Sequence, residues 1–357
     1  MHAKRITALA LALVMTLLLA ACGSKTVVND DGTKTEQTER GVKVTQTAAK
    51  AVQTEKYETA DFSMTIPKGW TVTSGGTNIY HSIRVYDPNE PLNQMFVLLK
   101  ADVLLHSQAG KDAWQQNYNM GDTQAALFAK AAVLDNPSTE GFFKIFSQYT
   151  AFASEVEPAY SGYAFPRFDN FTVTDRYPSA SPMKSSALGD EQLRATFTDN
   201  GKEGEGLFAA SVVDFGSFTI SNGNVVGYQL QAVDGGYYMA YNIVAVTAAK
   251  DTFIEWEGVL TDCFKTLQYS DSFVSAANQA SNEKVALAQQ ISQNFNATMD
   301  GFMSSWESRN RSQDIMSQKQ SDATLGYERV YDTETGEIYK ATNGFTDVYD
   351  GKRYKAV

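Results

Sequence analysis

Short runs in which apolar and polar positions alternate recur along the chain from Tyr57 onward, and Gly, Pro, Asn and Asp separate them. Such alternation between turn residues is typical of β-strands with one buried face. It predicts strands over residues 62–66, 79–85, 95–99, 192–198, 207–218, 228–233 and 237–246. We expect the last two to form a hairpin across Asp234-Gly235-Gly236.

Apolar residues at helical spacing fill the intervals between several of these strands. They predict helices over residues 111–133, with Asp122 as an N-cap, and over residues 142–149. A third helix should begin at Thr252, where Glu255 completes a capping box. Because strands outnumber helices and no strand–helix–strand period repeats, we expect an α+β fold with a mainly antiparallel sheet and packed helices.

Beyond residue 270 the pattern changes twice. Residues 271–326 place apolar side chains three or four positions apart on one face, which predicts a long helical segment. Residues 327–357 alternate aromatic and polar positions between turn signals, which predicts a small C-terminal β-meander. So short a meander is marginal alone, and we therefore expect residues 271–357 to dock on another part of the chain.

Residues 1–21 have a basic start and an uninterrupted apolar run that ends at Ala21. This is a signal-peptide pattern, and a helix of that run, roughly 24 Å long, falls short of a bilayer core of about 30 Å. Leu19-Ala20-Ala21-Cys22 resembles the lipobox of bacterial lipoproteins. The resemblance implies cleavage before Cys22, lipid on that cysteine and an anchor on the extracytoplasmic face of the cell membrane.

The segment after the lipobox is polar, and its few valines have no period. The expected organisation is a signal peptide (1–21), the lipidated cysteine with a flexible tether (22–56), an α+β domain (57–270), a helical segment (271–326) and the meander (327–357).

The phrase Phe62-Ser63-Met64-Thr65-Ile66-Pro67-Lys68-Gly69-Trp70, together with a late helix near Thr252, is similar to the opening and close of PsbP-like domains. These are α+β modules of photosynthetic extrinsic proteins and of many bacterial lipoproteins. The likeness covers nine residues, and the helical block between Lys111 and Phe152 departs from the compact pattern. It implies a fold and no activity.

Charge restricts the partners. The formal net charge is −11, and it becomes −13 (28 basic against 41 acidic residues) once the leader and its two basic residues are removed. Such a chain repels phosphate backbones and anionic headgroups, so we expect no nucleic acid and an anchor that is covalent. With Cys22 lipidated, Cys263 has no disulfide partner in the chain, and its place beside Phe264 predicts a buried thiol.

Motifs for catalysis or metal binding are weak. His81 lies on an apolar face, which predicts a core histidine, and both Ser181-Pro182-Met183-Lys184 and Ser281-Asn282-Glu283-Lys284 match Ser-x-x-Lys at a rate that chance explains. The segment 332–337 alternates oxygen ligands but lacks EF-hand spacing, so a hairpin turn is favoured over a calcium loop. We predict no catalytic, cofactor or metal site. The tryptophans predict core anchors rather than a carbohydrate platform: Trp70, Trp114, Trp256 and Trp306.

The sequence thus favours a non-enzymatic envelope lipoprotein that contacts the membrane through Cys22 and binds another envelope protein or a wall component. Two alternatives stay open. A solute-binding receptor of a transporter would need two lobes and repeated βα units. A hydrolase of cell wall or extracellular polymer would place a buried carboxylate pair in a cleft.

Overall fold

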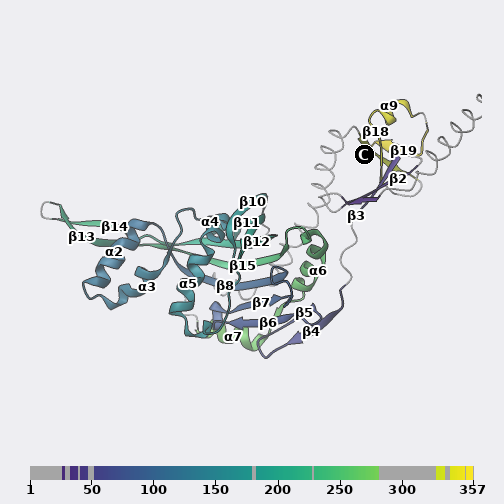
Figure 1. The fold of residues 1–357 in the computed structure, drawn as a ribbon. Helices are drawn as coiled ribbons and strands as arrows, with labels where there is room; N and C mark the ends of the chain where they lie inside the picture. Colours follow the sequence, from purple (N-terminus) through teal and green to yellow (C-terminus); the bar gives the residue numbers. More distant parts are fainter. Residues whose placement is uncertain are drawn as a thin grey trace, which may run out of the picture. The chain divides into compact units, whose positions relative to one another are not determined.

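The computed structural model describes residues 26–28, 33–38, 41–46, 52–178, 182–226, 229–280, 327–333, 338–349 and 351–356 (Figure 1). They belong to two compact units, which we treat separately. Unit 1 comprises the described parts of residues 1–48 and 310–357, and unit 2 comprises those of residues 49–309.

A mainly antiparallel sheet of eight strands forms the centre of unit 2 (Figure 1). Seven strands follow the order β10-β11-β12-β15-β8-β7-β6, and β9 (Ala132–Val133) pairs in parallel with the end of β8. The bounds are β6 (Thr71–Gly75), β7 (Ser82–Tyr86), β8 (Gln94–Leu105), β10 (Asp169–Pro178), β11 (Glu191–Asp199), β12 (Lys202–Gly216) and β15 (Tyr237–Ala249). The predicted α+β class is confirmed.

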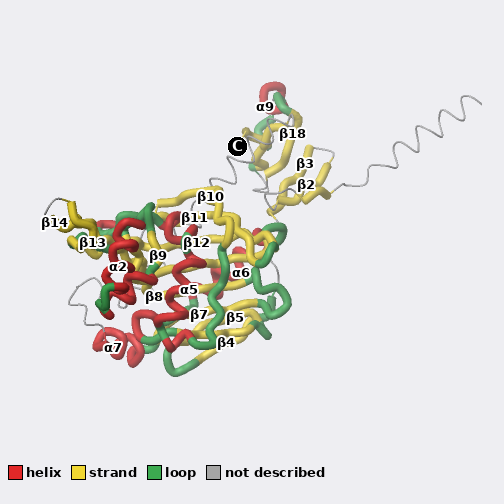
Figure 2. Tube along the Cα trace, turned by 60° about the vertical axis from the view of Figure 1, so that its left-hand side comes forward, coloured by secondary structure: helices red, strands yellow, loops and turns green. Residues whose placement is uncertain are grey.

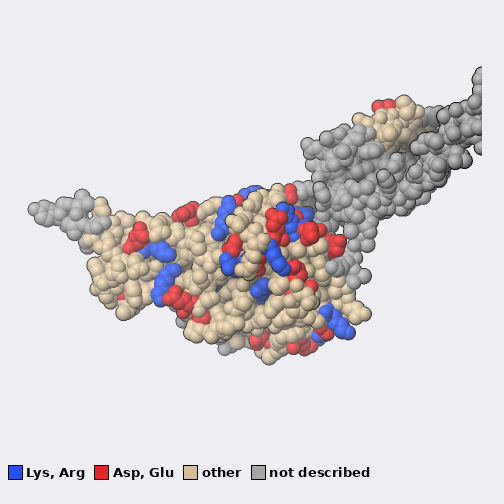
Figure 3. Space-filling view, in the orientation of Figure 1, with Lys and Arg blue, Asp and Glu red and all other residues tan. Residues whose placement is uncertain are grey.

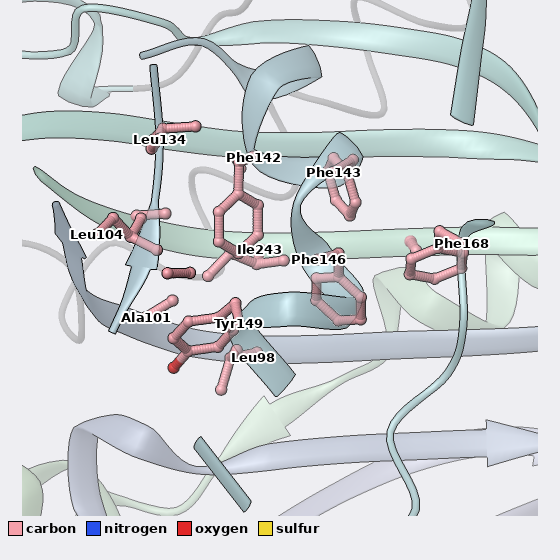
Figure 4. Packing of buried hydrophobic residues seen from close by; sticks show 14 of the residues in the cluster. Leu98, Ala101, Leu104, Leu134, Phe142, Phe143, Phe146, Tyr149, Phe168 and Ile243 are labelled. Carbon is pink, nitrogen blue, oxygen red and sulfur yellow. The ribbon is translucent and has the colours of Figure 1, made fainter. Parts of the chain in front are cut away.

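One face of this sheet is covered by α4 (Thr139–Lys144) and α5 (Phe146–Val156). The Ser138 hydroxyl accepts a hydrogen bond from the Gly141 amide and caps α4. Figure 4 shows the helices' aromatic side chains packed over the strands, and the buried set includes Phe142, Phe143, Phe146, Tyr149, Leu98, Leu104 and Ile243. In Figure 2 the helices, in red, lie over the yellow strands.

The opposite face packs against α6 (Phe253–Lys265) and a small sheet of order β16-β5-β4. Its strands are β4 (Thr54–Glu58), β5 (Phe62–Pro67) and β16 (Gln268–Tyr269). The predicted helix after Thr252 is confirmed. Its capping box does not form, because the Thr252 hydroxyl donates to the carbonyl of Ala249 instead of accepting from the helix.

The remaining elements of unit 2 lie at the edges of the sheet. The long helix predicted over residues 111–133 is divided into α2 (Gln108–Asn119), η2 (Thr123–Ala125) and α3 (Ala126–Lys130), and Asp122 caps η2 as predicted. A separate two-stranded sheet consists of β13 (Thr219–Val226) and β14 (Gln229–Asp234). The other short helices are η1 (Asn78–Tyr80), η3 (Pro158–Tyr160), η4 (Pro182–Ser185) and α7 (Asp271–Ala280).

Unit 1 joins residues from both parts of the chain in one sheet of order β1-β2-β3-β18-β17-β19. Its elements are β1 (Thr26–Val28), β2 (Thr33–Thr38), β3 (Gly41–Gln46), β17 (Tyr327–Asp332), β18 (Ile338–Thr342), α9 (Phe345–Val348) and β19 (Tyr354–Ala356). The link is the antiparallel pair β3–β18, in which Tyr339 lies opposite Lys43.

Two sequence-based expectations need correction. The flexible tether over residues 22–56 contains strands β1 to β3 and the start of β4: β1, β2 and β3 pair in sequence order, β4 pairs with β5, and β18 adds a distant partner to β3. The hairpin across Asp234-Gly235-Gly236 does not form: β14 pairs with β13, and β15 pairs with β12 and β8. The signal peptide, Cys22 and residues 281–326 lie outside the described residues.

Candidate binding surface at the β13–β14 arm

The segment that leaves β12 and returns to β15 carries no charge. Between Asp214 and Asp234 the sequence contains no Asp, Glu, Lys or Arg, although 20% of the whole chain is charged. We call residues 215–233 the arm; it contains β13 and β14. In Figure 3 charged side chains gather over the rest of unit 2, whereas the atoms drawn in colour at the β13–β14 end are mostly tan. The arm is therefore an uncharged surface on an acidic protein.

His106 ties the two ends of the arm together. It follows β8 directly, and its Nδ1 lies 2.8 Å from Asp234 Oδ2 while its Nε2 lies 3.1 Å from Asp214 Oδ1. The imidazole is largely buried, whereas the two carboxylates are 40% and 45% exposed. The Tyr238 ring covers the imidazole at a centroid distance of 4.1 Å. Three connections, β8–α2, β12–β13 and β14–β15, thus meet at one side chain.

The chemistry of this cluster is that of a clamp. Each ring nitrogen of His106 lies within hydrogen-bond distance of a different carboxylate, so this one side chain joins the two ends of the arm. The Ser217 hydroxyl donates a hydrogen bond to Asp234 Oδ2 at 3.1 Å. Burial raises the pKa of Asp234, but hydrogen bonds from His106, the Gly236 amide and Ser217 outweigh it and hold the pKa below its ordinary value. The clamp therefore favours an ionised Asp234.

Five aromatic rings surround the base of the arm and form what we call the aromatic cluster: Trp114, Phe128, Phe215, Phe218 and Tyr237. Phe215 stacks on Tyr237 at 4.5 Å, and Trp114 stacks on Phe128 at 4.4 Å. Phe218 contacts both Trp114 and Tyr237. Phe215 and Phe218 are nevertheless 51% and 37% exposed. Large exposed aromatic surface at one place indicates a site of interaction.

Helix α2 positions the arm from one side. Asn117 Nδ2 donates to the carbonyl of Ser221 on β13 at 3.0 Å, and the Trp114 indole donates to the carbonyl of Gly235 at 3.1 Å. A side chain at Gly223 would collide with Gln116, since a Cβ there would lie 2.0 Å from its amide nitrogen. Gly223 also has a φ of +74°, which glycine adopts without strain. The β13 side of the arm is therefore already occupied by α2.

Trp114, predicted as a core anchor, belongs to the aromatic cluster, whereas the other candidate residues from the sequence analysis that the structure describes lie apart from this surface. His81 is buried as predicted, and burial lowers its pKa to about 4. Cys263 is buried on α6, and burial raises its pKa to about 11. Lys184 is exposed, while both serines of the Ser-x-x-Lys matches lie outside the described residues. Trp256 is buried in the core as predicted, and the Trp70 ring packs beside it, tilted, at a centroid distance of 5.3 Å.

The first residue of segment 332–337, where a hairpin turn was favoured over a calcium loop, belongs to an ion pair. Asp332 is fully buried, and Arg353 donates to both of its carboxylate oxygens at 2.9 to 3.1 Å. Residues 334–337 lie outside the described part. Within the residues that the structure describes, no group of three or more His, Cys, Asp or Glu side chains is placed to hold a metal ion.

Sequence reasoning missed two features. His106 carries no local motif, because its carboxylate partners lie 108 and 128 positions away. Lys100 interrupts the apolar pattern of β8, yet it is buried: its Nζ lies 3.1 Å from Asp102 Oδ2 and 5.6 Å from the ring centres of Tyr80 and Tyr241. Tyr80 also donates to Asp102, at 3.0 Å. The signal that could have found Lys100 is a charge within an otherwise apolar strand.

Neither a family model nor a curated protein matches this sequence. Among the described residues, no helix combines the length and apolar character needed to cross a membrane.

Proposed function

We propose that the protein is a non-enzymatic lipoprotein, anchored by lipid on Cys22 at the extracytoplasmic face of the cell membrane, that binds or scaffolds another envelope component. The observation that carries this proposal is Leu19-Ala20-Ala21-Cys22 after a basic start and an apolar run. Two acyl chains hold a protein stably on a bilayer where one is marginal. The acidic charge agrees with a covalent rather than an electrostatic attachment.

The arm and the aromatic cluster supply the surface for binding. The clamp ties both ring nitrogens of His106 to carboxylates, which suits a positioning role better than proton transfer. Exposed Phe215 and Phe218 offer apolar contact area on a fixed base. An envelope protein or a wall component is the partner class that we propose for them.

We further propose that unit 2 is a PsbP-like α+β module. The motif phrase forms β5 and the turn after it, and α6 packs with β5 in one core. The α4–α5 block on the other face would be an addition to that pattern.

The anchor is tested by acyl labelling and membrane fractionation of the wild type, Cys22→Ala and Cys263→Ala. Cys263 is the matched control, since it is the other of the two cysteines. We expect label and membrane association in the wild type and in Cys263→Ala, and loss of both in Cys22→Ala. An unlabelled wild type, or label that persists in Cys22→Ala, would contradict the proposal.

A further inference from the structure

The outer edge of β14 offers backbone hydrogen-bonding groups. Among the described residues this sheet consists of β13 and β14, and α2 contacts mainly β13 and also the Asp234 end of β14, where a Cβ at Gly110 would lie 2.5 Å from the Asp234 carbonyl oxygen. In an antiparallel pair, successive residues of a strand direct both N–H and C=O alternately toward and away from the neighbour. About half of the six residues of β14 therefore direct these groups away from β13.

The edge lacks the features that usually prevent pairing. Edge strands are normally blunted by charged side chains, proline or bulges. Gln229–Val233 contains neither charge nor proline, and Asp234 is held by His106. The bulge in this sheet lies in β13. Ser221 pairs with Ala232 and Val225 pairs with Leu230, so the extra residues belong to β13. Strand β14 itself is continuous.

Every arm residue with a defined exposure, 215–223 and 231–233, is half-buried or exposed. A hairpin of two strands is marginally stable in water, and a third strand along the outer edge of β14 would add backbone pairing.

We propose that this strand is β14 of a second copy of the chain, paired antiparallel across a two-fold axis. A two-fold axis normal to an antiparallel sheet sets a residue opposite its own copy, so an axis at Ala232 places 232 opposite 232, 231 opposite 233 and 230 opposite 234. Charge selects this occupant. Copies of the mature chain, with a net charge of −13, repel each other, and this repulsion is smallest where neither surface carries charge, as at the arm. An uncharged strand offers no complementarity to a basic or acidic peptide.

The contact is small, so the dimer is weak when the chain is free in solution. Interfaces at the low end of the size range belong to transient complexes. If the chain is lipid-anchored as proposed above, confinement of both copies to one bilayer raises their effective concentration and favours the pair. The self-pairing itself does not depend on the anchor.

Ala232 allows a direct test, because it is exposed, uncharged and at the axis. We would measure sedimentation equilibrium of the mature chain in density-matched detergent, or in buffer if labelling shows no lipid. Ala232→Lys or Ala232→Glu places like charges beside each other in a self-pair and should weaken dimerisation at least about tenfold, equivalent to about 1.4 kcal/mol. An equimolar mixture of the two variants should recover the wild-type dimer fraction to within about twofold.

Thr219→Lys is the matched control, since Thr219 is exposed on β13 of the same arm, and it should leave the dimer unchanged. Unfolding curves that match the wild type show that each variant folds. If Ala232 variants unfold early, the pair Gln231→Lys and Gln231→Glu replaces them, because Gln231 is also exposed. A monomeric wild type, or charged variants that fold but do not associate when mixed, would overturn the proposal. Membrane association is scored separately by acyl labelling, so failure of the anchor and failure of the pairing are distinguished.

Discussion

His81 is expected to make unit 2 less stable as the pH falls. The ring is only 5% exposed and packs against Phe62, Tyr269 and Phe273 at centroid distances of 5.0 to 6.0 Å. Its Nδ1 lies 3.4 Å from the Tyr269 hydroxyl. Burial lowers the pKa of His81 to about 4, and the carboxylate of Asp61 opposes that shift. The fold therefore holds a neutral imidazole.

The sign and size of the effect follow from linkage. His81 takes up a proton near pH 6.5 in the unfolded chain, whereas in the folded chain it does so only near pH 4. The contribution of the neutral His81 ring to the free energy of unfolding is fully present above about pH 6.5 and is lost progressively as the pH falls to about 4. A difference of roughly two and a half pKa units corresponds to about 3 kcal/mol.

The assay is urea unfolding between pH 7.5 and pH 4, followed by tryptophan fluorescence, because all four tryptophans lie within residues 49–309. The comparison is between the wild type and His81→Phe, which keeps an aromatic ring and removes the titration. Other groups titrate equally in both chains, so the loss of unfolding free energy on acidification should be about 3 kcal/mol smaller in His81→Phe. Identical pH dependence in the two chains would refute the reasoning.

Three further predictions concern other buried or clamped groups. His106→Gln removes the two-sided clamp and should speed amide hydrogen exchange in β13 and β14 while leaving α6 unchanged; equal exchange throughout would show that the clamp does not hold the arm. Asp332→Asn breaks the buried pair with Arg353 and should destabilise β17 by about 3 kcal/mol in hydrogen exchange, whereas Asp347→Asn, at an exposed site, should change it little. Cys263 should react with a maleimide only after unfolding in urea, since burial raises its pKa to about 11; rapid labelling of the folded chain would disagree.

Elements with a strong local pattern could be predicted from the sequence. The alternation at residues 62–66 became β5, and the helical face after Thr252 became α6. These segments bury one face against a single core, and the spacing of their apolar residues follows from that burial. The α+β class followed from the order of such segments.

Strand partners could not be predicted in the same way. Asp234-Gly235-Gly236 is a turn signal, yet it joins two strands that pair with other neighbours. The polar segment before residue 50 forms the local ladders β1–β2 and β2–β3, and β18, almost 300 positions later, extends them by pairing with β3. Local propensity is a weak guide where long-range ladder partners and a side-chain clamp decide the structure.

The candidate site was missed for a related reason. His106 has an unremarkable local sequence, and its role exists only where three connections converge. The uncharged run between Asp214 and Asp234 was visible in the sequence. The sequence does not show that both flanking carboxylates bind one histidine or that β14 lies at an edge, so the run could not be recognised as a binding surface.

Mass spectrometry of the amino-terminal peptide from membrane-extracted protein decides whether the lipid anchor is present. We expect a peptide that begins at Cys22, lacks residues 1–21 and carries the added mass of a diacylglyceryl group on that cysteine. A peptide that begins elsewhere, or an unmodified Cys22, would refute the anchor.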